Sequence, residues 1–165
     1  MAFIVAGALV WFWRRDAATG VLVAAIGVGS IAFHGPMPIW GEFVHDLSIV
    51  LTLVWVLLVE TRRTRFWHLG FGLAAATSIT PTVADPVQAV LAVGVLAAVS
   101  LQRAQRPYRL QAIAILALGS VVGTLSRTGG PLCEPDSLWQ GHGFWHLSAA
   151  TSLAIWGLAI RPPAK

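Results

Sequence analysis

Long apolar runs separated by short polar stretches set the pattern of this chain. Six runs of about 17 or 18 residues cover positions 17–34, 43–60, 66–83, 86–102, 110–126 and 143–160. A shorter apolar run at positions 1–13 precedes them. A helix needs about 17–25 predominantly apolar residues to cross the hydrocarbon core of a bilayer. The pattern therefore predicts seven membrane helices.

The runs favour helices over the strands of a membrane barrel. In hydrocarbon, backbone polar groups must be paired within one helix or around a closed barrel. Barrel strands extend for about ten residues with strict alternation of polar and apolar positions, and the runs here are longer and continuously apolar. We expect an all-α fold, with one seven-helix transmembrane domain over residues 1–165.

The first run is interpreted as a membrane helix and not as a signal peptide. Its charges, Arg14 and Arg15, follow the apolar stretch, whereas a signal peptide carries its charge before that stretch. The run is short for a span. Either the natural start lies upstream, or this helix is tilted or incomplete.

Composition supports a membrane protein and argues against nucleic acid as a partner. Apolar residues make up 56% of the chain and charged residues 11%, against about 25% charged in a typical soluble domain. The mean hydropathy is +0.73 and the pI is about 10.6. The basic residues lie in short clusters between apolar runs, without the basic stripe expected of a nucleic-acid surface. The bilayer is the expected partner.

The placement of the basic residues predicts the orientation. Of the 11 basic residues, only Arg127 lies in an even-numbered connection. The other ten lie in the first, third and fifth connections and the C-terminal tail: Arg14, Arg15, Arg62, Arg63, Arg65, Arg103, Arg106, Arg109, Arg161 and Lys165. Cytoplasmic loops carry an excess of Lys and Arg. Seven helices with the N-terminus outside and the C-terminus in the cytoplasm fit this rule, whereas six or eight helices do not.

Three histidines and an aspartate fall at one face of the predicted membrane. His34 lies near the outer end of the second run, and Asp46 near the outer end of the third. His142 and His146 begin the seventh run and, four residues apart, share a helix face. Because the topology comes from the arginines alone, the gathering of these residues at one face is an independent observation. Ionisable groups within membrane segments usually mark function.

This set of residues predicts a catalytic zinc site. Three histidines with an open fourth position are a common zinc arrangement in enzymes, so His34, His142 and His146 are the candidate Zn2+ ligands. Bound zinc lowers the pKa of its water toward 7 and polarises a carbonyl group. Asp46 is the acidic residue within a helix at that face and is the candidate base. Ser30, one turn before His34, is the candidate oxyanion donor.

Each of these residues also has a simpler interpretation. The two histidines of the seventh run lack the glutamate of the zincin motif. In the simpler interpretation, His34, His142 and His146 form a polar cluster without metal. Ser30 would donate to its own helix, and Asp46 would favour a helix start. His45 and His68 would be solvated interfacial residues, His45 having the alternative of a supporting or spare ligand. The remaining candidates are interpreted as loop residues: Glu42, Cys133, Glu134 and Asp136.

Two sequence blocks resemble the alkaline ceramidase family, part of the CREST group of seven-helix membrane hydrolases that includes adiponectin-receptor-like proteins. They are Ser30-Ile-Ala-Phe-His34 with Asp46 a dozen residues later, and the stretch from Cys133 that ends in His142-Gly-Phe-Trp-His146. The resemblance implies that the three histidines bind zinc, that the aspartate assists the water and that the serine holds the oxyanion.

The chain also departs from that family. It is shorter than the eukaryotic ceramidases and has no room for their acidic N-terminal calcium-binding segment, and its connection at residues 35–38 is tighter. The compact connections suggest a bacterial member in the inner membrane, whose substrate need not be ceramide. The expected function is a zinc-dependent intramembrane hydrolase of a ceramide-like amide, or of an ester, in a lipid substrate. The sequence leaves the oligomeric state open.

Three other functions are weighed against this one. A receptor-like member of the same group would keep the ligands without turnover. A haem protein is disfavoured because His142 and His146, on one helix face, cannot flank a single haem. A small transporter is disfavoured because the polar residues gather at one face and not at the midplane.

Overall fold

The computed structural model describes residues 1–126, 129–133 and 141–160. Within these residues the fold is entirely helical, which confirms the predicted all-α class. The elements are α1 (Ala2–Arg14), α2 (Ala17–His34), α3 (Gly41–Glu60), the short 3-10 helix η1 (Thr64–Phe66), α4 (Trp67–Ser78), α5 (Pro81–Leu101), α6 (Arg106–Leu125) and α7 (Gly141–Ala159). Several residues interpreted from the sequence lie outside the described part of the chain: Arg127, Glu134, Asp136, Arg161 and Lys165.

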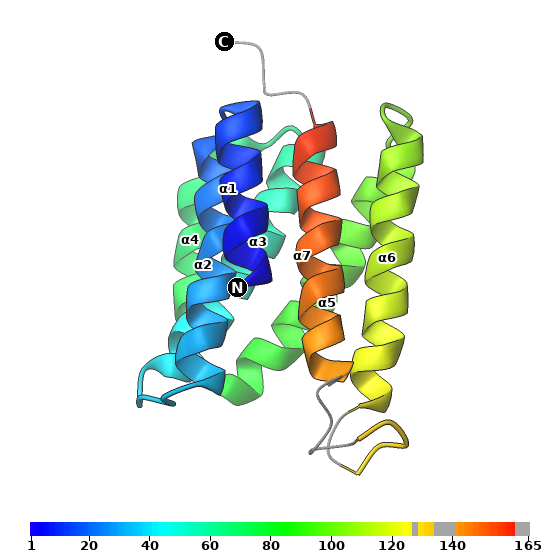
Figure 1. Ribbon diagram of the computed structural model, residues 1–165. Coiled ribbons are helices and arrows are strands. Elements are labelled where there is room, and N and C mark those ends of the chain that lie inside the picture. The colour runs from blue at the N-terminus through cyan, green and yellow to red at the C-terminus, as the bar shows by residue number, and fades with distance from the viewer. Residues whose placement is uncertain (127–128, 134–140, 161–165) are drawn as a thin grey trace.

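The helices run alternately up and down a single bundle (Figure 1). The connections α1–α2, α3–α4 and α5–α6 lie at one end, together with Arg14, Arg62 and Arg103, and we call this the arginine end. At the opposite end α2 finishes at His34 and α7 begins at Gly141, and we call this the histidine end. The alternation places these basic connections at one end and His34, His142 and His146 at the other.

Four of the described helices are long and apolar enough to cross a membrane: α2, α3, residues Thr82–Leu101 of α5, and α6. Each has 18 to 20 residues, which corresponds to about 27–30 Å at 1.5 Å per residue and matches the hydrocarbon thickness. These four helices are consistent with a membrane protein. α1 has 13 residues and α4 has 12, which gives only about 18–20 Å for each.

The fourth predicted run is broken earlier than its hydropathy indicates. The sequence predicts one span over residues 66–83 and a new helix from Pro86, but α4 ends at Ser78 and α5 begins at Pro81. Thr80 is extended, with φ −123° and ψ 109°, as steric contact with a following proline requires. A proline is favoured at the first position of a helix because it needs no backbone donor there. Pro86 consequently lies inside α5.

The sixth helix begins at Arg106, earlier than the predicted start at residue 110. Arg109, interpreted as a loop residue, is therefore inside α6 and buried. Its guanidinium pairs with the carboxylate of Glu60 at the end of α3. The indole nitrogen of Trp156 in α7 donates to the same carboxylate oxygen at 2.7 Å. We call Glu60, Arg109 and Trp156 the glutamate cluster, and it joins three helices near the arginine end.

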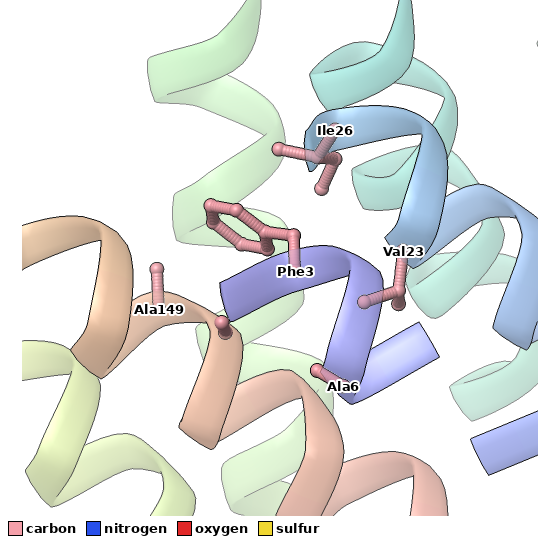
Figure 2. Close-up of a cluster of buried hydrophobic side chains, with 6 residues drawn as sticks. Phe3, Ala6, Val23, Ile26 and Ala149 are labelled. Atoms are coloured by element: carbon pink, nitrogen blue, oxygen red, sulfur yellow. The ribbon is translucent and has the colours of Figure 1, made fainter. Parts of the chain in front are cut away.

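A second group of buried residues holds α7 against α1 and α2. Figure 2 shows the side chain of Phe3, which belongs to α1, between Ile26 of α2 and Ala149 of α7. The group consists of Phe3 and Ala6 from α1, Val23 and Ile26 from α2, and Ala149 and Ala150 from α7. In lipid, close van der Waals packing of small residues drives helix association. The alanines let the helices approach, and the packing holds the middle of α7 against α1 and α2.

Candidate metal centre

The structure brings together the three predicted histidine ligands. His34 is the last residue of α2, and His142 and His146 lie in the first two turns of α7. Their ligand nitrogens all lie within 4.8 Å of one another. The ring centroids of His34 and His142 are 4.9 Å apart, and those of His142 and His146 are 4.6 Å apart. We call these residues the histidine trio.

Helix packing around the trio explains its position. A tight turn ends α2, since the backbone N–H of Gly35 donates to the carbonyl of Ile31 at 2.9 Å. On α7, Trp145 packs over Gly123 of α6, where an added Cβ would lie 2.9 Å from the Cβ of the tryptophan. From α1, the ring of Phe3 meets His146 edge-on at 5.7 Å.

The donor set fits a zinc ion with an open position. Zinc binds histidine nitrogens at about 2.0–2.1 Å in tetrahedral geometry, so two ligand nitrogens lie about 3.3 Å apart. The Nε2 atoms of His142 and His146 are 2.9 Å apart, and no ligand nitrogen of the three histidines lies more than 4.8 Å from another. His34 and His142 are exposed and His146 is half-buried. A water or substrate molecule therefore has access to the centre.

Ser30 lies one turn before His34 on α2 and differs from most other helical hydroxyls in this chain. Its Oγ is buried and has no hydrogen-bond partner within the described residues. By contrast, Thr52, Thr77 and Ser120 each donate to the carbonyl four residues earlier at 2.8 or 2.9 Å. The alternative that Ser30 bonds to its own helix is therefore wrong in this structure. The Oγ of Ser78, the last residue of α4, is likewise buried and without a partner, so Ser30 is distinguished by its place one turn before His34.

Asp46 is buried, and its hydrogen bonds run to side chains. Its Oδ1 accepts from Nε2 of Gln88 on α5 at 3.2 Å and lies 3.2 Å from Nδ1 of His45. Asp46 is the sixth residue of α3, which begins at Gly41 and has no side-chain cap. An interaction with the helix dipole falls off within the first turn. The structure therefore does not support the interpretation that Asp46 stabilises the start of α3.

His45 links Asp46 to the trio. It is half-buried, and its ring lies 5.5 Å from the ring of His34 and 5.1 Å from that of Phe33. The structure thus favours a supporting role for His45 over a solvated interfacial one. His68, in contrast, is exposed in the first turn of α4 at the arginine end, beside the ring of Trp67.

Sequence reasoning missed Gln88. The available signal was a single amide side chain in the otherwise apolar stretch 87–99 of α5. A polar side chain in such a stretch needs a hydrogen-bond partner, and Asp46 provides it. Two residues interpreted as loop residues fall within the described part of the chain. Glu42 is exposed as expected, but it lies in the first turn of α3 and is therefore not a loop residue. Cys133 is half-buried, lies outside the helices and is not in a disulfide.

These observations define a class of protein: a helical bundle with membrane-length helices and a three-histidine centre at one end. Comparison of the chain with protein-family models, with curated proteins and with solved structures found no match in any of the three. The resemblance to the alkaline ceramidases therefore stays a prediction. The case for a function depends on the geometry of the centre.

Proposed function

We propose that this protein is a zinc-dependent intramembrane hydrolase that cleaves an amide bond, ceramide-like in chemistry, or an ester bond in a lipid substrate. One observation carries the proposal. Three imidazoles from two helices converge at the histidine end, one turn from the unpartnered hydroxyl of Ser30. Buried hydroxyls are usually hydrogen-bonded, so an unpartnered hydroxyl this close to three imidazoles is a candidate contact for a substrate.

Each residue has a distinct role in this reaction. His34, His142 and His146 hold the metal, which when bound acts as a Lewis acid and makes water acidic enough to be a nucleophile at neutral pH. Asp46 accepts the proton of the attacking water and returns it to the leaving nitrogen of an amide or the leaving oxygen of an ester. The Ser30 hydroxyl donates to the substrate carbonyl oxygen as negative charge develops on it.

A lipid substrate suits the surroundings of the centre. Helices α5 and α6 expose large apolar side chains along their outer surfaces, among them Val90, Val93, Leu118 and Val121. An acyl chain in the bilayer would contact such surfaces without meeting water. The reacting group of a lipid lies near the membrane interface, and the trio lies at a bundle end. The substrate would therefore reach the centre sideways from the bilayer.

The proposed topology has seven spans in the cell membrane, the inner membrane of a bacterium, with the N-terminus outside and the C-terminus cytoplasmic. It is supported by the gathering of the basic connections at one end of the bundle and by the positive-inside rule. The short α1 and α4 would require local thinning of the bilayer. A C-terminal reporter that is active only on the outer side would contradict this orientation.

Metal analysis and turnover, measured on one detergent-purified preparation, test the proposed function. We expect about one zinc per chain and release of labelled fatty acid from a lipid amide. A His68→Ala variant is the matched control, since it removes a histidine at the opposite end. Zinc without turnover of any amide or ester would indicate a receptor-like metal protein. Absence of bound zinc would contradict the proposal.

A further inference from the structure

The carboxylate of Asp46 is held from a different helix. Its Oδ1 accepts the hydrogen bond from Gln88 on α5, and the same oxygen contacts His45. Neither contact uses Oδ2. The terminal torsion of an aspartate is broad and roughly two-fold, so a carboxylate in a bundle interior can present its oxygens in several directions. Contacts from two residues to one oxygen remove that freedom.

The surroundings of Gln88 indicate that its amide is there for Asp46. Between residues 87 and 99, α5 carries no other polar side chain. Gln88 is half-buried, and a polar group in such a place lowers stability unless it is hydrogen-bonded. The hydrogen bond to Asp46 meets that requirement.

We propose that Gln88, together with His45, is a positioning residue that fixes Oδ1 of Asp46 and thereby presents Oδ2 for proton transfer at the trio. This inference rests on the proposed function. It adds α5 to the centre, although none of the predicted ligands comes from that helix. Gln88 acts through Asp46 and does not itself contact the reacting atoms.

The test is a double-mutant cycle with a matched control. Gln88→Met removes the donor while keeping an unbranched side chain and good helix propensity. Gln102→Met is the control, since the side chain of Gln102 also donates to α3, to the backbone carbonyl of Glu60 at 3.0 Å, but near the arginine end. We expect Gln88→Met to lower kcat by about 10- to 100-fold, the effect of a misplaced reacting group, with KM and zinc content unchanged. Gln102→Met should leave kcat within about two-fold.

The second arm of the cycle separates positioning from a general structural effect. In an Asp46→Asn background Gln88→Met should cause no further loss of kcat, because two residues that act through one contact are not additive. Losses that multiply would overturn the positioning role while the hydrolase proposal stands. An equal loss of kcat in Gln102→Met would also overturn it.

A readout independent of turnover uses the metal-free protein. The melting temperatures of Asp46→Ala, Gln88→Met and the double variant should be non-additive if the two side chains are hydrogen-bonded, because Asp46→Ala removes the acceptor oxygen. Additive shifts would overturn the contact and the inference with it. Absence of wild-type turnover on every lipid amide and ester would instead be a failure of the proposed function. The two failures are therefore distinguishable.

Discussion

Two polar clusters, one at each end of the bundle, are built differently. In the glutamate cluster near the arginine end, the Glu60 side chain is 1% exposed and that of Arg109 is 9% exposed. Opposite charges meet there, and the Trp156 indole donates to the same carboxylate. In the histidine trio two of the three residues are exposed, and the groups that meet are of one kind. We call the glutamate cluster the closed cluster, because it is buried, and the histidine trio the open cluster, because two of its residues are exposed.

The difference suggests what each cluster does. Glu60 and Arg109 neutralise one another, and their contacts join separate helices. The cluster therefore stabilises the fold without requiring a ligand. Three imidazoles cannot neutralise one another, but their lone pairs can all bind one metal cation. The open cluster is therefore the one suited to a ligand. The predictions below test this division, beginning with the largest expected effect.

The reaction proposed at the open cluster is tested most strongly by Asp46→Asn, because Asp46 is the proposed base. Turnover of a lipid amide should fall by about 10²- to 10⁴-fold, the usual loss without general acid–base help, while zinc stays bound. Ser30→Ala should cost about 10²- to 10³-fold, as oxyanion donors do, also with zinc retained. Turnover and zinc are measured on the same preparation. Near-normal turnover of Asp46→Asn with zinc bound would eliminate the mechanism, and loss of zinc would make Asp46 a ligand.

The closed cluster should dominate stability. Glu60→Ala leaves the Arg109 guanidinium buried without its partner, which costs about 3–5 kcal/mol and should appear as a large drop in the detergent melting temperature. Replacing both partners with leucine should restore most of that loss, because paired charges are often replaceable by apolar residues. An equally large drop for His146→Ala in metal-free protein would remove the distinction between the two clusters.

Metal affinity should depend on the open cluster and not on the closed one. His142→Ala or His146→Ala should weaken zinc binding by at least about 10²-fold, since even the loss of residues that only support a ligand costs 10- to 100-fold. His68→Ala and Glu60→Gln should leave affinity unchanged. Zinc titration against a competing chelator measures all four variants. Full zinc content in a His142→Ala/His146→Ala double variant would refute the assignment.

The smallest effects concern the glycines that set the helix spacing. A Cβ on Gly29 of α2 would lie 2.8 Å from the Cα of His45, so Gly29→Ala should destabilise by about 1–3 kcal/mol through overpacking and weaken zinc binding. A Cβ on Gly94 of α5 meets nothing within 4 Å. Gly94→Ala should stabilise by about 0.5–1 kcal/mol without affecting zinc. Equal melting temperatures for both variants would show that the close approach of α2 and α3 does not constrain the histidine end.

The sequence by itself determined the helical class and the end of the bundle at which His34, His142 and His146 meet. Apolar run length is a local property, and each short connection reverses the chain. Counting reversals is therefore enough to place these residues at one end, provided that the count is right. The predicted boundary between α4 and α5 was misplaced by a few residues, but the chain still reverses there, at Thr80. The number of reversals was therefore unaffected.

Only the tertiary structure decided which residues at each end touch. The contacts of Gln88 with Asp46, of His45 with His34, and of Arg109 with Glu60 join residues of different helices. Hydropathy and spacing describe one helix at a time and leave undetermined its rotation and its lateral neighbours. Those depend on how closely small residues such as Gly29, which has no Cβ, let two helices approach, and that is a property of the packed bundle.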